Sequence, residues 1–106
     1  MQFIRRIARP FLLAALLVAP LVVGCAGMPL QQMSDARQAI RAAERAGAEK
    51  HAPQLLEEAR GLVQRASQSM HKGDYREARD GAELARVKAM EARRIAEEAR
   101  AAASSP

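Results

Sequence analysis

The stretch that decides the fold is residues 74–102, DYREARDGAELARVKAMEARRIAEEARAA, where small residues recur at alternating steps of three and four. This spacing places side chains on one face of an α-helix. The members of that face are Tyr75, Ala78, Ala82, Ala85, Ala89, Ala92, Ala96 and Ala99. Charged residues fill most positions between them, so the stretch predicts one long helix over about 74–102 with an alanine-rich seam.

Two shorter helices are predicted upstream, over about residues 34–47 and 53–72. Ser34 is suited to cap the first helix, Gly47 to end it, and Pro53 to open the second. Their apolar faces are Met33, Ala36, Ile40, Ala43 and Gly47 in the first, and Leu56, Ala59, Val63, Ala66 and Met70 in the second. No segment has the periodicity of a strand. The sequence therefore predicts an all-α fold, an antiparallel three-helix bundle or long helical hairpin with an alanine-rich coiled-coil seam.

The lengths of the predicted helices differ. The third is about 42 Å long at 1.5 Å per residue, against about 30 Å and 21 Å for the other two. Its end, with Ile95, Ala96 and Ala99, is expected to extend beyond the shorter helices, where it either frays or packs on a second copy or another protein.

A tight turn is predicted between the second and third helices. Gly73 can end a helix, and Asp74 with Glu77 three positions later resembles a capping box. This segment also resembles the turn between the two helices of a tetratricopeptide repeat, which implies that Tyr75 and Ala78 pack against the preceding helix. The chain lacks the 34-residue period of a repeat array. The resemblance favours protein interaction over catalysis.

Residues 1–24 have the order of a secretory signal, with a basic start followed by an apolar run. The run from Phe11 to Val23 has 13 residues, whereas a membrane-spanning helix needs about 20. The end of this run and the two residues after it, Val22–Cys25 (VVGC), resemble the lipobox of bacterial lipoproteins. That resemblance implies cleavage between Gly24 and Cys25, a diacylglyceryl group on the Cys25 thiol and an acyl chain on its new amino group.

Cys25 is the only cysteine, so no intramolecular disulfide can form. Two or more acyl chains anchor a protein stably, and no other cofactor is predicted. Ala26 stands where inner-membrane lipoproteins carry Asp, which implies a location on the periplasmic face of the outer membrane. The predicted organisation is a signal peptide over 1–24, a lipidated cysteine and tether over 25–33, a helical domain over 34–103 and a disordered tail over 104–106.

The charge is modest once the signal is removed. The formal charge of +5 includes Arg5, Arg6 and Arg9, and without them 14 basic residues face 12 acidic ones. This balance disfavours a nucleic-acid partner. His51 and His71 are 20 residues apart, near opposite ends of a predicted helix about 30 Å long, so a shared metal site would need a second chain. No catalytic residue set and no small-molecule substrate site is evident, so we expect no enzyme.

A row of arginines follows the tether. Arg37, Arg41 and Arg45 are spaced by four and place three like charges along one helix. One interpretation is contact with anionic lipid headgroups or lipopolysaccharide phosphates. The alternative is a solvated face.

The helical region also has a family resemblance over about residues 33–100. It rests on Ala39-Ile40, Ala43, Ala46-Gly47-Ala48, His51-Ala52-Pro53, Leu55-Leu56, Ala59, Gly73-Asp74-Tyr75, Ala78, Ala82 and Ala85. In this order, and with a lipobox upstream, these pieces resemble the short periplasmic lipoproteins of domain-of-unknown-function family 4398. The family implies no assigned biochemical activity.

Two function classes remain open. The first is a small interaction or scaffold lipoprotein whose helices dock an envelope protein or a second copy through the seam and the end of the third helix. The second is a structural envelope lipoprotein, a rod resembling the murein lipoprotein with noncovalent peptidoglycan or outer-membrane contact. Covalent attachment to the wall is disfavoured because that protein ends in lysine, whereas this chain ends in Ser105-Pro106.

Overall fold

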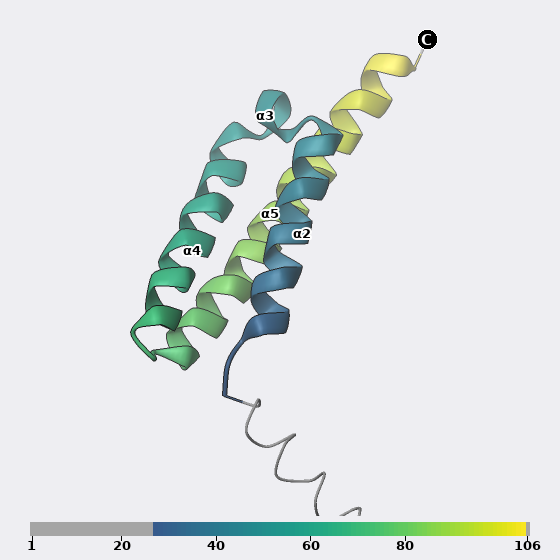
Figure 1. The fold of residues 1–106 in the computed structure, drawn as a ribbon. Coiled ribbons are helices and arrows are strands. Elements are labelled where there is room, and N and C mark those ends of the chain that lie inside the picture. Colours follow the sequence, from purple (N-terminus) through teal and green to yellow (C-terminus); the bar gives the residue numbers. More distant parts are fainter. Residues whose placement is uncertain (1–26, 106) are drawn as a thin grey trace, which may run out of the picture.

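The computed structural model describes residues 27–105, and Figure 1 shows its ribbon. Four helices follow one another with short connections: α2 (Leu30–Ala46), α3 (Ala48–His51), α4 (Pro53–His71) and α5 (Tyr75–Ser104). No strand occurs among the described residues, so the all-α prediction is confirmed for them. The predicted signal segment, residues 1–24, and the predicted lipidation site Cys25 lie outside the described part of the chain.

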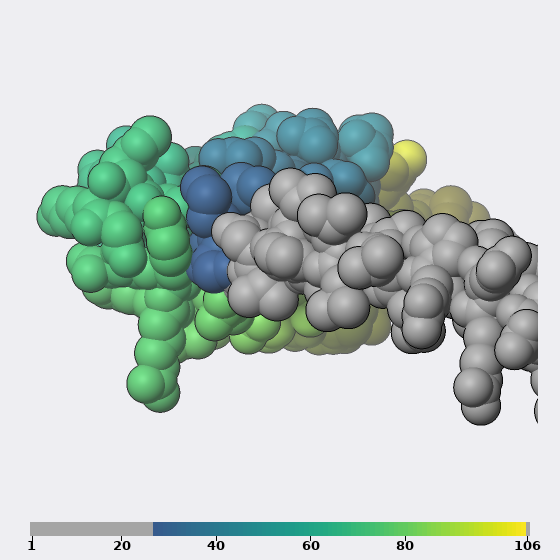
Figure 2. Space-filling view, turned by 60° about the horizontal axis from the view of Figure 1, so that its bottom comes forward, coloured from purple at the N-terminus to yellow at the C-terminus, as the bar shows by residue number. Residues whose placement is uncertain are grey.

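The three long helices lie side by side (Figure 1). Helix α5 runs in the same direction as α2 and opposite to α4, and it packs along both of them. The short helix α3 sits at the end where α2 stops and α4 starts. When the bottom of Figure 1 is tilted forward, the start of α2 in dark blue lies beside the green α4–α5 region (Figure 2). Helix α5 is therefore the common partner of the other helices.

The alanine seam of α5 forms the centre of the core. Six of its alanines have no exposed surface, namely Ala78, Ala82, Ala85, Ala89, Ala92 and Ala96. All of these except Ala78 belong to two adjoining clusters, together with Met33, Ala36, Ile40 and Ala43 of α2 and Leu56, Ala59 and Ala66 of α4. Because alanine is short, α4 and α5 approach closely: a Cβ added at Gly81 would lie 3.4 Å from the Cβ of Ala66. The predicted seam thus packs inside the molecule.

Helix α2 begins one turn earlier than expected. The sequence predicted a cap at Ser34, but the helix starts at Leu30 after Pro29, and the predicted tether over 25–33 is correspondingly shorter. The Met33 amide donates to the Pro29 carbonyl at 3.0 Å, and Met33 is buried at 2% exposure. Burial of Met33 against α5 stabilises the extra turn. The Ser34 hydroxyl instead accepts a hydrogen bond from Gln38 at 3.3 Å.

The connections between helices follow their predicted glycine and proline signals. Gly47 adopts φ 97° and ends α2, while Pro53 occupies the first turn of α4. Between them lies the unpredicted helix α3, a single turn whose Ala48 is fully buried. Ala52, which follows α3, is also buried, at 7% exposure. Packing of these two small residues against α5 accounts for the extra turn.

The end of α5 has more partners than its length suggested. Ala96 is fully buried, and Ile95 packs against the same cluster, which contains Ala46, Ala48 and Ala52. The expectation that Ile95 and Ala96 lie beyond the other helices is therefore wrong, because the turn around α3 covers this part of α5. Only in residues 101–104 is every side of the helix exposed. The helix continues to Ser104, two residues past its predicted end and into the predicted tail.

Candidate functional site

The alanine seam is not available to a partner in this fold, because its alanines are covered by α2 and α4. Docking through the seam, as the sequence suggested, would require the helices to separate. The surface of α5 that remains exposed lies on the side away from the seam. It presents two different features, one apolar and one basic.

The apolar feature consists of large side chains on the outside of α5. Leu84, Val87 and Met90 are exposed at 46%, 53% and 53%, and partly buried Leu55 of α4 joins them. Together they line a hollow of about 750 Å³ whose other lining residues are Arg86, Lys88, Glu91 and Arg94. We call these four apolar residues the outer apolar face. Such a grouping with a charged rim is typical of an interaction surface.

This face exists because α5 places its small apolar side chains inside and its large ones outside. Helix α5 buries alanines and exposes Leu84, Val87 and Met90, although larger apolar residues normally occupy the core. The seam positions are reserved for small residues by the close approach of α4. Leu84, Val87 and Met90 are spaced by three, and that spacing was the sequence signal that could have revealed the face.

The basic feature is a groove between α2 and α5, made of two adjoining hollows of about 430 and 280 Å³. Both contain Ala42, Arg45 and Arg93; Arg86 lines the larger and Arg100 the smaller. We call this region the α2–α5 groove. Its carboxylates are Asp35 in the larger hollow and Glu97 in the smaller.

The structure separates the three arginines that the sequence grouped. All of Arg37, Arg41 and Arg45 are exposed, but only Arg45 lines the α2–α5 groove. Each step of four residues rotates a side chain about 40° around a helix, which carries Arg45 away from Arg37. Its neighbours in the groove come from α5. The missed sequence signal is the seven-residue spacing of Arg86, Arg93 and Arg100.

The turn between α4 and α5 is formed as predicted at its glycine but not at its cap. Gly73 has φ 84°, and the Asp74 amide donates to the Ser69 carbonyl at 2.9 Å. Asp74 occupies the N-cap position of α5, yet its side chain makes no capping hydrogen bond. The capping box with Glu77 is therefore not formed. The left-handed glycine supplies the turn.

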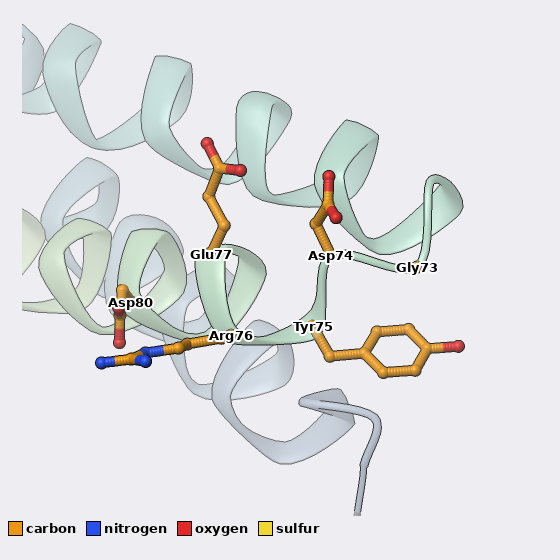
Figure 3. Close-up of a pocket in the computed structure, with 6 residues that line it drawn as sticks. All are labelled: Gly73, Asp74, Tyr75, Arg76, Glu77 and Asp80. Atoms are coloured by element: carbon orange, nitrogen blue, oxygen red, sulfur yellow. The ribbon is translucent and has the colours of Figure 1, made fainter.

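Tyr75 does not pack against α4 as the repeat-like turn implied. It is only partly buried, and its ring points away from the helices (Figure 3). The ring approaches the start of the described chain, where a Cβ on Gly27 would lie 3.7 Å from it. The hollow of about 670 Å³ beside the turn is lined by acidic and basic side chains together, with Asp74, Arg76, Glu77 and Asp80 among them. Ala78 packs inward as expected.

The ion pairs within α5 are structural. Arg94 contacts Glu91 and Glu98 of the same helix at 2.6 Å each, and Arg93 contacts Glu97 at 2.7 Å. The hydrogen bond from Arg94 lowers the pKa of Glu91. All of these side chains are about half exposed, so they support the helix surface rather than form a reactive site.

Among residues 27–105, no group of three or more His, Cys, Asp or Glu side chains could hold a metal ion. His51 ends α3 and His71 ends α4, and α4 with its 19 residues separates them. Within the same residues, no helix combines the length and the apolar character needed to cross a membrane.

Comparison with known proteins gives one match. The family model described as Domain of unknown function (DUF4398) matches residues 31–105. These residues contain α3, α4 and α5 and all but the first residue of α2. No curated protein and no solved structure matches the chain.

Proposed function

We propose that this chain, which belongs to the DUF4398 family, is a lipid-anchored periplasmic protein that acts by binding another protein through the outer apolar face. In this proposal the helices form an antiparallel three-helix bundle. Cys25 carries the lipid and holds the bundle at the periplasmic face of the outer membrane. The role is non-catalytic and needs no cofactor beyond the lipid.

The observation that carries the proposal is the exposure of Leu84, Val87 and Met90. Each leaves about half of its surface in water, although the same helix buries alanines. Burial of apolar area contributes roughly 25 cal/mol per Å², so a partner that covers these side chains would gain stability. Arg86, Lys88, Glu91 and Arg94 around them supply charges of both signs for a polar rim.

Exposed apolar residues near the start of α2 support the proposed anchor. Met28 and Leu30 are exposed at 44% and 56%, and they follow Cys25 by three and five residues. This short interval would keep that end of the bundle close to the membrane surface. Exposed apolar side chains at this position would meet lipid headgroups rather than bulk water.

The test is site-specific photocrosslinking in cells, with a photoreactive residue at position 87 or at Gln64, an exposed position of α4. We expect a defined crosslinked product from position 87 and none from position 64. The product should disappear when Met90→Glu is added, because a buried carboxylate opposes apolar contact. Its mass distinguishes a second copy, which would favour the rod-like structural role, from an unrelated envelope protein. The absence of a product from position 87 would contradict the proposal.

A further inference from the structure

The α2–α5 groove is a second surface feature, which borders the outer apolar face because Arg86 and Met90 line both. Its floor contains Ala39, Ala42 and Ala46, whose short side chains leave space between longer ones. Arg45 reaches it from α2, while Arg86 and Arg93 reach it from α5. Three arginines from two helices thus line a hollow of about 430 Å³.

The positive charge of the groove is only partly neutralised within residues 27–105. Arg93 donates from Nε to Glu97 at 2.7 Å, which leaves its two Nη groups available. In the larger hollow, the carboxylate of Asp35 accepts a hydrogen bond from Gln31 at 2.8 Å. Neither Arg45 nor Arg86 forms an ion pair with another described residue, and Arg86 makes only a 3.4 Å contact with the sulfur of Met90.

Arg100 has a different task at the end of the groove. Its Nη1 lies 3.4 Å from the carbonyl oxygens of Arg45 and Ala46, at the carboxyl end of α2. Carbonyls there carry partial negative charge, which a cation offsets. Arg100 therefore offsets the partial negative charge of the end of α2, close to Arg45 and Arg93.

We propose that the α2–α5 groove binds a soluble oligophosphate through Arg45, Arg86 and Arg93. The planar guanidinium fork matches phosphate oxygens and binds them with two parallel hydrogen bonds. Arg86 and Arg93 are seven residues apart, about 10 Å along the helix. A ligand with two or more phosphate groups suits three arginines spread over this length, with Arg45 facing it from α2.

The position of the groove favours a soluble anion over a lipid headgroup. Arg45 is 15 residues beyond Leu30, about 22 Å along α2 from the end nearest Cys25. Headgroups of the anchoring membrane would therefore be out of reach of an upright bundle. This choice of source rests on the proposed anchor, whereas phosphate binding itself does not.

The test is calorimetric titration of the full chain, in neutral detergent at low ionic strength, with inorganic tripolyphosphate. We expect Arg45→Gln and Arg93→Gln each to weaken binding about tenfold, as the loss of a charge-assisted hydrogen bond implies. Arg37→Gln and Arg41→Gln are matched controls, because these exposed arginines share α2 with Arg45 but line neither hollow. They should weaken binding less than about twofold.

Glu97→Gln is a variant with the opposite expected effect. It frees Arg93 from its carboxylate and removes a negative charge from the groove, so tripolyphosphate should bind more tightly, by roughly threefold. Circular dichroism of every variant confirms that helicity is retained. Equal weakening by Arg37→Gln and Arg45→Gln would show non-specific attraction and overturn the site, as would the absence of binding to the unmodified chain.

Vesicles distinguish the source of the phosphate. Cys25→Ser protein, which cannot be anchored by lipid, is mixed with phosphatidylcholine vesicles with and without phosphatidylglycerol. We expect that substituting Arg45 or Arg93 does not change the binding of the protein to either kind of vesicle. Binding to the anionic vesicles that is lost in Arg93→Gln would overturn the choice of a soluble ligand. The tripolyphosphate result stays valid if Cys25 proves not to be lipidated, so the two proposals fail separately.

Discussion

Arg60 of α4 donates a hydrogen bond from Nη2 to a carboxylate oxygen of Glu49 in α3, at 2.8 Å. The same guanidinium contacts Glu57 at 2.6 Å and Glu44 of α2 at 3.4 Å. Carboxylates from three helices thus converge on one cation. These hydrogen bonds, that of Glu49 first, raise the pKa of Arg60 above its ordinary value. Arg60 ties α2, α3 and α4 together where the chain turns.

Arg60→Met should lower the free energy of unfolding by about 1 kcal/mol, the upper range for ion pairs that are partly exposed. The Arg60 side chain is 35% exposed, so solvent screens its contacts. Thermal melting followed by circular dichroism measures the change. Arg65→Met, at an exposed position of the same helix, is the control and should leave the melting temperature unchanged. An equal shift in both variants would show that the ion pairs of Arg60 add no stability.

Substitutions of the two helical glycines Gly61 and Gly81 should have opposite effects on the stability of the protein. A Cβ at Gly61 would meet no atom within 4 Å, so Gly61→Ala should stabilise the protein by about 1 kcal/mol through helix propensity. Gly81 faces Ala66 and the Leu62 carbonyl. Gly81→Leu should destabilise it by roughly 1–3 kcal/mol, because α4 and α5 must move apart. Urea denaturation compares the two, and a stable Gly81→Leu variant would contradict the close approach.

Ala89 lies in the middle of the buried seam with no exposed surface. Ala89→Glu should cost more than about 3 kcal/mol, because it buries a carboxylate without a partner. We expect a lower melting temperature and a less cooperative transition. Ala101→Glu makes the same substitution at an exposed position of the same helix. If the two variants melt alike, the periodicity of the alanines has no structural role.

The lipid anchor predicts that Cys25→Ser abolishes acylation and membrane association. Metabolic labelling with palmitate and membrane fractionation measure both, and the precursor should remain uncleaved or become soluble. Ala26→Asp is the companion variant, because the lipoprotein resemblance implies that it retains the protein at the inner membrane. Unchanged processing and sedimentation of Cys25→Ser with the membrane would disprove the anchor.

The pKa of Glu91 is lowered below its ordinary value of about 4.5 by its hydrogen bond from Arg94. A carboxylate with a lowered folded pKa stabilises the fold above its unfolded pKa, and this contribution is lost as the pH falls through the folded pKa. Acidification should therefore weaken the middle of α5. Arg94→Gln should return the pKa of Glu91 toward its ordinary value in a carboxyl-detected NMR titration. An unchanged titration would show that the pair does not persist in solution.

Much of the fold could be predicted because its signals are local. The steps of three and four that group Ala78, Ala82 and Ala85 follow from helix geometry alone. Likewise, a residue without Cβ is required at the positive φ of Gly47 and Gly73. Each of these features depends only on neighbours in the sequence. The three long helices and the glycines that end two of them were therefore recognisable without any knowledge of packing.

The candidate surfaces could not be predicted in the same way. The sequence grouped Arg45 with Arg37 and Arg41, but its neighbours in the fold are Arg86 and Arg93 of α5. Nor could the sequence indicate that Ala48 and Ala52 would cover Ala96. These relationships join residues more than 40 positions apart, and their geometry depends on how closely the helices approach.

The sequence by itself determined that the described chain is helical, where its helices turn, and which face of the longest helix is small enough to be buried. Only the tertiary structure decided what covers that face and what remains outside. Because α2, α3 and α4 all pack against the alanine seam, Leu84, Val87 and Met90 on the other side of α5 remain exposed to water. Helix periodicity defines faces, but the partner of each face is chosen by packing across the whole molecule.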